Sequence, residues 1–253
     1  MHKRIYEPKG VTALSKENTH YLEKVMRLKP GNSFLIIDGE GEEIEAILGE
    51  KGNFKITSRS RPDRELQIET RLFAAITKGD RIETLIEKSV EIGILRITPL
   101  LAERCVAGSP SPSKLDRWRK IAVSAMLQCG GCILPNIDDP IKTSEIPESG
   151  ENTLAILLHE VPKSNEVLPP DNLQPSNTKF NTCSDQIRLK RHLFIASGPE
   201  GGFSENEAAI FQEKGWQSVC LGKRIFRADT APLVALSAIL FGEVFANMKL
   251  RTF

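Results

Sequence analysis

The sequence predicts an α/β domain built on a parallel sheet, preceded by a smaller β-rich domain at the N-terminus. From residue 71 onward, short apolar runs alternate with helical patterns, which is typical of a parallel sheet covered by helices. Before residue 70 the apolar runs are short and are separated by glycine-containing turns. We therefore expect two domains, residues 1–70 and residues 71–253.

The first seventy residues begin with a helical pattern and continue as short strands. Apolar side chains recur at helical spacing from Glu17 to Leu28, and Pro30-Gly31 ends the pattern. Four β-like runs follow, at residues 33–37, 44–48, 54–57 and 66–70. Many short strands with glycine turns predict a small barrel or sandwich. The charges of this segment nearly balance, so a structural role and an RNA-binding role both stay open.

The second domain has the strand and helix order of an open α/β sheet. Residues 71–76, 94–101, 154–158, 193–196 and 216–221 are short apolar runs that predict buried strands. Helical patterns cover residues 83–92, 114–128, 204–215 and 233–248. Residues 161–190 are rich in Pro, Asn, Ser and Asp, which is typical of a loop.

Two loops near the C-terminus collect the polar residues that could carry chemistry. The first, Ser197 to Gly202, contains three glycines and a proline, which allow the backbone to approach a ligand closely. It leads into a capping box, Ser204-Glu205-Asn206-Glu207, at the start of a helix. The second loop, Gly222 to Pro232, follows the next strand. Open α/β sheets bind small molecules at the carboxyl ends of such strands.

The first loop matches neither the dinucleotide-binding pattern G-x-G-x-x-G nor the phosphate loop G-x-x-x-x-G-K-[ST]. A nucleotide-dependent enzyme that places a phosphate on this loop is one interpretation of the α/β pattern. Glu200 argues against it, because a carboxylate next to a polyanion is unfavourable.

Composition and charge restrict the class of protein. The chain is 40% hydrophobic and 26% charged with a net charge of +1, which is ordinary for a soluble globular protein. Any RNA-binding surface must therefore be a local patch. The charged N-terminus lacks the apolar core of a signal peptide, and the apolar run 233–241 is shorter than the about 20 residues that span a bilayer. We expect a cytoplasmic protein, and the odd number of cysteines, five, agrees with a reducing compartment.

Cys129-Gly130-Gly131-Cys132 has the C-x-x-C spacing, but no second pair of similar spacing accompanies it. It also lies at the end of a helical pattern, whereas a redox pair usually lies at a helix N-terminus. We expect neither a redox nor a metal site there.

The two loops resemble the signature of a known family. GPEGGFSENE followed by LGKRIFRADTAP is similar to GPEGG(F/L)S..E and LG.RILRTETA of the RsmE family, the 16S ribosomal RNA (uracil-N3)-methyltransferases of the SPOUT superfamily. The segment from Lys78 to Arg104 also matches the family pattern. The resemblance implies a SPOUT-type parallel sheet with a C-terminal trefoil knot and an N-terminal PUA-like β-barrel. It implies transfer of the methyl group of S-adenosylmethionine to uracil N3 of one uridine.

The resemblance also assigns residues. Uracil N3 must lose its proton in the implied reaction, which requires a base or a cation. Arg224 and Arg227 suit the role of the cation, and Asp229 suits either the orientation of one arginine or the role of the base; the sequence does not decide between these. The residues expected to bind S-adenosylmethionine are His159, Gly198, Pro199, Glu200, Gly201, Gly202, Leu221, Gly222, Ile225, Phe226 and Ala231. His159 follows the strand 154–158, where a hydrogen-bonded residue at the rim is favoured over a base.

The expected partners are 16S ribosomal RNA, within the assembled small ribosomal subunit, and a second copy of the chain. The residues expected to bind RNA are Arg4, His20, Arg27, Lys78, Arg81 and Arg104. The apolar helix 233–248 is expected at the interface of a homodimer.

The chain departs from the family pattern at several positions. Phe226, Ala228 and Asp229 replace the usual Leu, Thr and Glu, and Leu127 and Gly131 replace a usual Glu and Arg. The replacements at Leu127, Gly131 and Asp229 motivate an alternative, an RNA-binding protein of the same fold that is catalytically impaired. The sequence alone leaves the catalytic base and the target uridine open.

Overall fold

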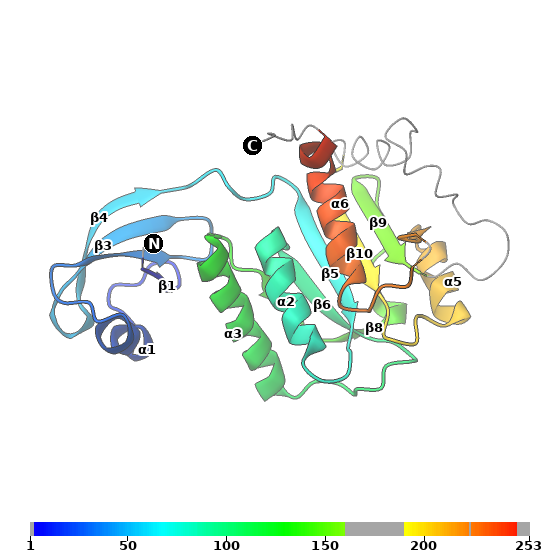
Figure 1. Ribbon diagram of the computed structural model, residues 1–253, viewed down its shortest axis with the longest axis horizontal. Coiled ribbons are helices and arrows are strands. Elements are labelled where there is room, and N and C mark those ends of the chain that lie inside the picture. The colour runs from blue at the N-terminus through cyan, green and yellow to red at the C-terminus, as the bar shows by residue number, and fades with distance from the viewer. Residues whose placement is uncertain (1–2, 160–189, 223, 247–253) are drawn as a thin grey trace, which may run out of the picture. The chain divides into compact units, whose positions relative to one another are not determined.

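The computed structural model describes residues 3–159, 190–222 and 224–246 (Figure 1). The described residues divide into two compact units. The first contains residues up to 66 together with 120–135, and the second contains residues 67–119 and those from 136 onward. The sequence predicted a single boundary near residue 70, and the structure adds residues 120–135 to the first unit.

The first unit contains a four-stranded sheet in the order β1-β2-β3-β4. Its strands are β1 (Arg4–Tyr6), β2 (Ser33–Ile37), β3 (Glu43–Leu48) and β4 (Phe54–Ser60). β1 and β2 are parallel, whereas the other neighbours are antiparallel. Alternate side chains of β3 are buried, and they pack with Ile5, Leu22, Phe34 and Ile36 in one core. The three predicted strands from residue 33 to residue 57 are confirmed.

The predicted helix over residues 17–28 is confirmed as far as Val25, but its second half is a π-helix and residues 26–28 lie beyond it. The α-helix α1 covers only Lys16–His20 and is capped by Ser15, whose side chain accepts a hydrogen bond from the Asn18 backbone. It continues as a π-helix, Tyr21–Val25, in which Met26 N donates to Tyr21 O at 2.9 Å. The wider turn still directs Leu22 and Leu28 into the core, so apolar spacing alone does not distinguish the two helix types.

Residues 130–135 are held in the first unit by backbone hydrogen bonds. Gly41 N donates to Cys132 O at 3.0 Å, and Leu134 N donates to Gly39 O at 2.9 Å. Cys132 is buried, and its thiol lies 3.3 Å from Arg64 Nη2. Cys129, by contrast, is exposed.

The second unit is built on a seven-stranded sheet in which every neighbouring pair is parallel. The order is β11-β9-β10-β5-β6-β7, and β8 also pairs with β6. The strands are β5 (Glu69–Ala75), β6 (Arg96–Leu101), β7 (Asn136–Ile137), β8 (Ile141–Lys142), β9 (Thr153–Leu158), β10 (His192–Ser197) and β11 (Gln217–Val219). The predicted strand at residues 66–70 is wrong, because residues 66–68 belong to no strand and β5 begins only at Glu69.

The helices that follow β5 in the sequence are in the predicted order. They are α2 (Arg81–Ile92), α3 (Pro112–Cys129), α5 (Glu205–Glu213) and α6 (Ala231–Ala246). α2 and α6 lie against each other, as Figure 1 shows. Met248 of the predicted last helix and nearly all of the predicted loop 161–190 lie outside the described residues. Among the described helices, none is both long and apolar enough to cross a membrane.

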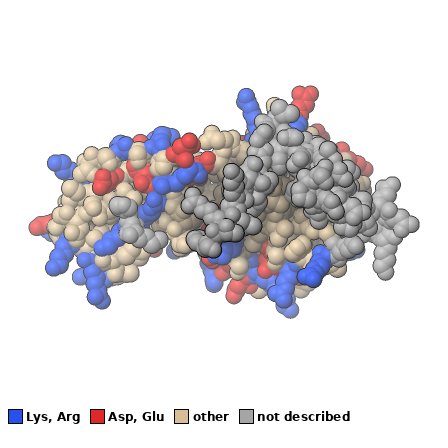
Figure 2. All heavy atoms as spheres, turned by 45° about the horizontal axis from the view of Figure 1, so that its top comes forward, with Lys and Arg blue, Asp and Glu red and all other residues tan. Residues whose placement is uncertain are grey.

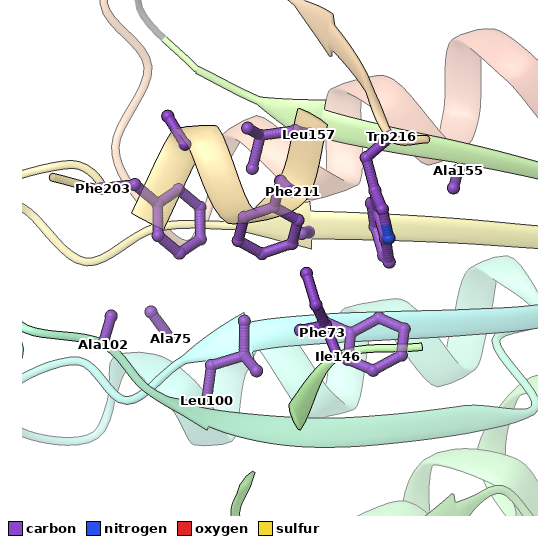
Figure 3. Packing of buried hydrophobic residues seen from close by; sticks show 12 residues of the cluster. Phe73, Ala75, Leu100, Ala102, Ile146, Ala155, Leu157, Phe203, Phe211 and Trp216 are labelled. Atoms are coloured by element: carbon purple, nitrogen blue, oxygen red, sulfur yellow. The ribbon is translucent and has the colours of Figure 1, made fainter. Parts of the chain in front are cut away.

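An aromatic cluster joins α5 to the sheet (Figure 3). The rings of Phe73 and Trp216 meet edge to face with centroids 5.4 Å apart, and those of Phe211 and Trp216 do so at 5.1 Å. Phe203, at the end of the first glycine-containing loop, packs on Phe211 at 5.0 Å. Such aromatic pairs contribute about 0.5–1.5 kcal/mol each beyond the area that they bury. The loop is therefore tied to the core on its C-terminal side.

A carboxylate stabilises the opposite end of the sheet. Asp138 follows β7 and accepts hydrogen bonds from four side chains, those of Arg71, Arg96, Thr98 and Asn136, at 2.6 to 3.0 Å. Burial alone would raise the pKa of Asp138, but the hydrogen bonds from Arg96 and Thr98 and the charge of Arg71 outweigh it and hold that pKa below its usual value.

We expect Asp138→Asn to lower the free energy of unfolding by about 2 kcal/mol at neutral pH, because charge-assisted hydrogen bonds are lost. A depressed pKa stabilises the fold at pH values above the unfolded pKa, and this stabilisation is lost as the pH falls through the folded pKa. The difference between wild type and variant should therefore shrink below about pH 4. Urea unfolding at neutral and acid pH measures this difference in the free energy of unfolding. Asp139→Asn is the matched control, because Asp139 is 84% exposed and lies 3.7 Å from Arg119. An equal difference at both pH values would contradict the prediction.

Candidate functional site

The carboxyl ends of five parallel strands meet at one edge of the sheet in the second unit. The strands β6, β7 and β8, which follow β5 in the sequence, lie on one side of it. The later strands β9, β10 and β11 lie on its other side, with β10 next to β5. The direction in which the chain adds strands to the sheet therefore reverses at β10. Open α/β sheets bind ligands at such a reversal. β10 and its neighbours are aligned, since Ser197 pairs with both Ala74 and Leu158. The loops that follow β5, β9 and β10 therefore start at the same position along the strand direction.

Most of the predicted site residues follow these strand ends. Lys78 follows β5, Arg104 follows β6 and His159 follows β9. The residues from Gly198 to Gly202, hereafter the glycine loop, follow β10. The second loop, predicted from Gly222 to Pro232, follows β11 and ends where α6 begins at Ala231, and its Lys223 lies outside the described residues. Arg4, His20 and Arg27 belong to the first unit.

The glycine loop turns too tightly for a side chain at its first position. A Cβ on Gly198 would lie 3.2 Å from Phe203 N and 3.3 Å from Gly202 C, and both are backbone atoms that cannot move aside easily. Gly202 adopts a left-handed conformation with φ of 68°, and its N–H donates to Pro199 O at 2.8 Å. The two glycines keep the backbone of the loop compact.

Two arginines from neighbouring segments bind the glycine loop. Arg104 Nη1 donates to Gly201 O at 2.8 Å and to Phe203 O at 3.4 Å. Arg81 Nη1 donates to Glu200 Oε1 at 2.8 Å, at the start of α2. Sequence reasoning predicted both arginines as RNA contacts. In the structure both bind the loop, while their contact with RNA stays a prediction.

The buried carboxylate of Glu207 fixes the far side of the loop. The Glu207 carboxylate accepts a hydrogen bond from Ser204 N, and the Ser204 hydroxyl accepts one from Glu207 N. The predicted capping box is therefore confirmed. In addition, Glu207 Oε1 accepts hydrogen bonds from Glu103 N at 2.9 Å and from Thr143 Oγ1 at 3.1 Å. Glu103 immediately precedes Arg104. One carboxylate therefore connects the end of the glycine loop with the segment that carries its arginine.

The second loop is attached to β10 and presents exposed side chains. Ser197 Oγ donates to Ala228 O at 3.1 Å, which places the second loop beside the end of β10. Thr230 N and Ala231 N both donate to Arg227 O at 2.9 Å and form the turn before α6. The remaining predicted residues of this loop that are exposed are Gly222, Arg224, Ile225, Phe226 and Arg227.

Two polar atoms at this edge are buried and have no hydrogen-bond partner within the described residues. They are Asp229 Oδ1 and Thr77 Oγ1. Buried polar groups are almost always paired, so an unpaired group at a strand end indicates a place for ligand atoms. Asp229 was predicted from the sequence, whereas Thr77 and Ser197 were not. The signal for both is a hydroxyl at the end of a continuous apolar strand, but many structural hydroxyls share it.

A thiol at this edge is a poor nucleophile. Burial raises the pKa of Cys105, which follows Arg104, and hydrogen bonds with the backbone of Ala102 and Ile76 offset only part of this effect. A raised thiol pKa means little thiolate at neutral pH. Covalent catalysis by Cys105 is therefore unfavourable.

The predicted RNA contacts differ in their exposure. His20, Arg27 and Lys78 are exposed, whereas Arg4 is largely buried and pairs with Glu43 at 3.1 Å. Figure 2 shows Lys and Arg side chains next to Asp and Glu side chains over much of the visible face. On this face the positive side chains are therefore not gathered in one large patch.

Comparisons with known proteins agree with this architecture. Residues 64–240 match the family model of the RNA methyltransferase domain, and residues 14–57 match that of the RNA methyltransferase PUA domain. Ribosomal RNA small subunit methyltransferase E of Synechocystis is 34% identical over 234 residues, which are 91% of this chain and 73% of the relative. The chain belongs to the ribosomal RNA small subunit methyltransferase E family. The member from Bacillus subtilis is 26% identical and is matched over 94% of this chain and 93% of its own length.

Solved structures of similar proteins have the same fold. The ribosomal RNA small subunit methyltransferase E of Neisseria gonorrhoeae, bound to S-adenosyl methionine, is 27% identical with a TM-score of 0.74, over 94% of this chain and 97% of that one. A putative methyltransferase of Legionella pneumophila, in complex with the same cofactor, is 27% identical with a TM-score of 0.75, over 96% of this chain and 98% of that one. The prediction of a parallel α/β sheet with a PUA-like N-terminal domain is confirmed.

We expect Glu207→Ala to lower the free energy of unfolding of the second unit by about 3 kcal/mol, because buried donors lose a charged acceptor. Urea unfolding followed by tryptophan fluorescence measures it, since Trp216 packs beside Phe211 of the same helix. Glu205→Ala is the control, because Glu205 is exposed in the same turn. Equal stability of the two variants would contradict a central role for Glu207.

Proposed function

We propose that this protein transfers the methyl group of S-adenosylmethionine to N3 of one uridine in 16S ribosomal RNA. The observation that carries the proposal is the paired loops at the reversal of strand order, in a chain that belongs to the ribosomal RNA small subunit methyltransferase E family. The prediction of uracil N3 comes from the resemblance of these two loops to the family signature.

The residues of the edge fit the cofactor. S-adenosylmethionine supplies an electrophilic methyl group on a sulfonium. We propose that the glycine loop and the second loop bind it through backbone and apolar contacts, together with His159 and Ala231. Asp229 Oδ1 and Thr77 Oγ1 support this, because both are buried acceptors that a ligand with N–H or O–H groups would satisfy.

The reaction requires alignment and charge stabilisation. In-line attack on a sulfonium methyl gains most from holding the nucleophile and the methyl group in line. Uracil N3 must lose its proton, and negative charge then spreads to the neighbouring carbonyl oxygens. We propose that Arg224 and Arg227, exposed on the second loop, stabilise this charge, and that Asp229 orients one of them or accepts the proton.

The assembly and location of the protein follow from the same proposal. The substrate is 16S ribosomal RNA within the small ribosomal subunit, so the protein acts in the cytoplasm. A homodimer through α6 is supported by half-exposed apolar side chains there, among them Leu233, Val234 and Leu240. The trefoil knot stays a prediction, to which the hydrogen bond between Ser197 and Ala228 lends support.

Methyl transfer to purified small ribosomal subunits that lack the modification tests the function. We expect one methyl group per subunit, and mass spectrometry of digested RNA should identify it as N3-methyluridine. Binding of subunits without methyl transfer would favour the alternative, a catalytically impaired RNA-binding protein. The replacements at Leu127 and Gly131 motivate that alternative.

The roles of the arginines can be separated by kinetics. Arg104→Met should weaken binding of S-adenosylmethionine by roughly tenfold or more, because two carbonyls of the loop region lose a charged donor. Arg227→Lys should leave that affinity unchanged and reduce turnover on bound RNA, because lysine lacks the planar donor pair of arginine. Calorimetry measures the first effect and single-turnover methyl transfer the second. Loss of affinity in both variants with normal turnover would show that the two roles are not separate.

A further inference from the structure

The π-helical turn of the first unit presents a mixed aromatic and basic surface. We call His20, Tyr21, Lys24, Val25 and Arg27 the π-turn surface. Tyr21 is 37% exposed and Val25 is 59% exposed, although the neighbouring Leu22 is fully buried. In a π-helical turn residues four apart still lie on nearly the same side, so Tyr21 and Val25 lie together, and Lys24 between them in the chain is exposed too. His20, at the end of α1, adjoins them and is exposed as well.

The backbone around this surface is unusual. π-helical turns are rare and occur frequently at functional sites. Within the described residues, only Arg27 and Lys51 adopt positive φ without being glycine, at 54° and 56°. Neither residue type favours the left-handed region, in contrast to Asn and Asp. Strain of this kind persists where it serves a function, which motivates a search for a ligand.

Lys51 lies beside the same helix. Its neighbour Gly52 packs so closely on α1 that a Cβ there would lie 2.5 Å from Thr19 Oγ1, and Thr19 immediately precedes His20. Leu14 N also donates to Gly52 O at 3.3 Å. Both strained residues are basic and exposed; Lys51 lies beside α1, and Arg27 follows the π-helical turn that begins at Tyr21.

The charge of this region is positive. This region contains five basic and three acidic residues. They are Lys16, Lys24, Arg27, Lys29 and Lys51, and Glu17, Glu23 and Glu50. The excess gives a local net charge of +2, which is more than the whole chain carries. Only two large apolar side chains are exposed here, so the patch is small for a protein partner, whose contact area usually has an apolar centre.

An exposed aromatic ring between cations fits an unpaired nucleotide. Bases of single-stranded RNA stack on aromatic side chains while Lys and Arg bind the flanking phosphates. The bases of an RNA duplex are already stacked and are not available in this way. We propose that the π-turn surface binds an unpaired segment of ribosomal RNA, with a base stacked on Tyr21 and with Arg27 and Lys51 on phosphates of the same strand. The identity of this RNA rests on the proposed function, whereas the stacking site does not.

Binding of a labelled, unstructured twelve-nucleotide oligouridine to the full chain tests the stacking. Tyr21→Ala should weaken binding by about 5- to 100-fold, the range found for loss of one base–aromatic stack. Tyr21→Phe should bind nearly as tightly as wild type, because the ring is retained. Ile56→Ala is the matched control, since Ile56 is also 37% exposed on the first unit. A blunt-ended RNA duplex of the same length should bind all four proteins alike.

The strained cations give a second, independent measurement. Arg27→Asn and Lys51→Asn should each reduce the salt dependence of oligouridine binding, by about 0.7 in the slope of log affinity against log salt. Both should leave the melting temperature equal or higher, because Asn tolerates positive φ. A purely structural role of these residues predicts a lower melting temperature and an unchanged slope.

Two outcomes overturn the inference. If Tyr21→Ala and Ile56→Ala bind oligouridine as wild type does, the surface does not stack bases, and a protein partner becomes the better interpretation. If Tyr21→Phe loses as much affinity as Tyr21→Ala, the hydroxyl and not the ring carries the contact. Methylation of small subunits by wild type is scored separately. Failure there would reject the proposed function without affecting the oligouridine result.

Discussion

The arrangement of the site depends on the buried carboxylate of Glu207. Its two oxygens accept hydrogen bonds from the backbone N–H groups of Ser204 and Glu103 and from the hydroxyl of Thr143. These groups come from three separate segments, so one side chain sets the distance between the glycine loop and the end of β6. A buried carboxylate without such donors would be costly, which makes the three segments and the carboxylate mutually dependent.

The arginines of the edge use this frame. Arg104 follows Glu103, so the backbone position that Glu207 fixes also directs the Arg104 side chain to the carbonyls of the loop. Arg81 neutralises Glu200, which removes the objection that a carboxylate within the loop repels a negatively charged ligand group. The loop is thus held by charged donors on one side and by the Phe203 and Phe211 rings on the other. A loop fixed in this way is preorganised and does not need to be ordered by its ligand.

Local patterns predicted the elements, whereas contacts between distant segments were not predictable. The capping box of α5 is visible as Ser204 and Glu207 three residues apart, but Glu103 and Thr143 lie too far away in sequence to be recognised as partners. The π-helix has the same apolar spacing as an α-helix over one turn, and therefore the pattern from Glu17 to Leu28 could not reveal it. The strand ends predicted where site residues would gather. Which arginine binds the loop and which meets RNA depends on side-chain directions that a sequence does not contain.

The central position of β10 has a consequence for the order in which the chain can fold. During synthesis β5 and β9 are complete well before β10, the strand that separates them in the sheet, has been made. Until then each has an unpaired edge facing a gap that only residues 192–197 can fill. Such open edges are prone to wrong pairing between nascent chains, and contacts of this sequence separation form slowly. The second unit therefore cannot be completed from its N-terminal side, and the newly made protein depends on the late addition of β10 between β5 and β9 and of β11 beside β9.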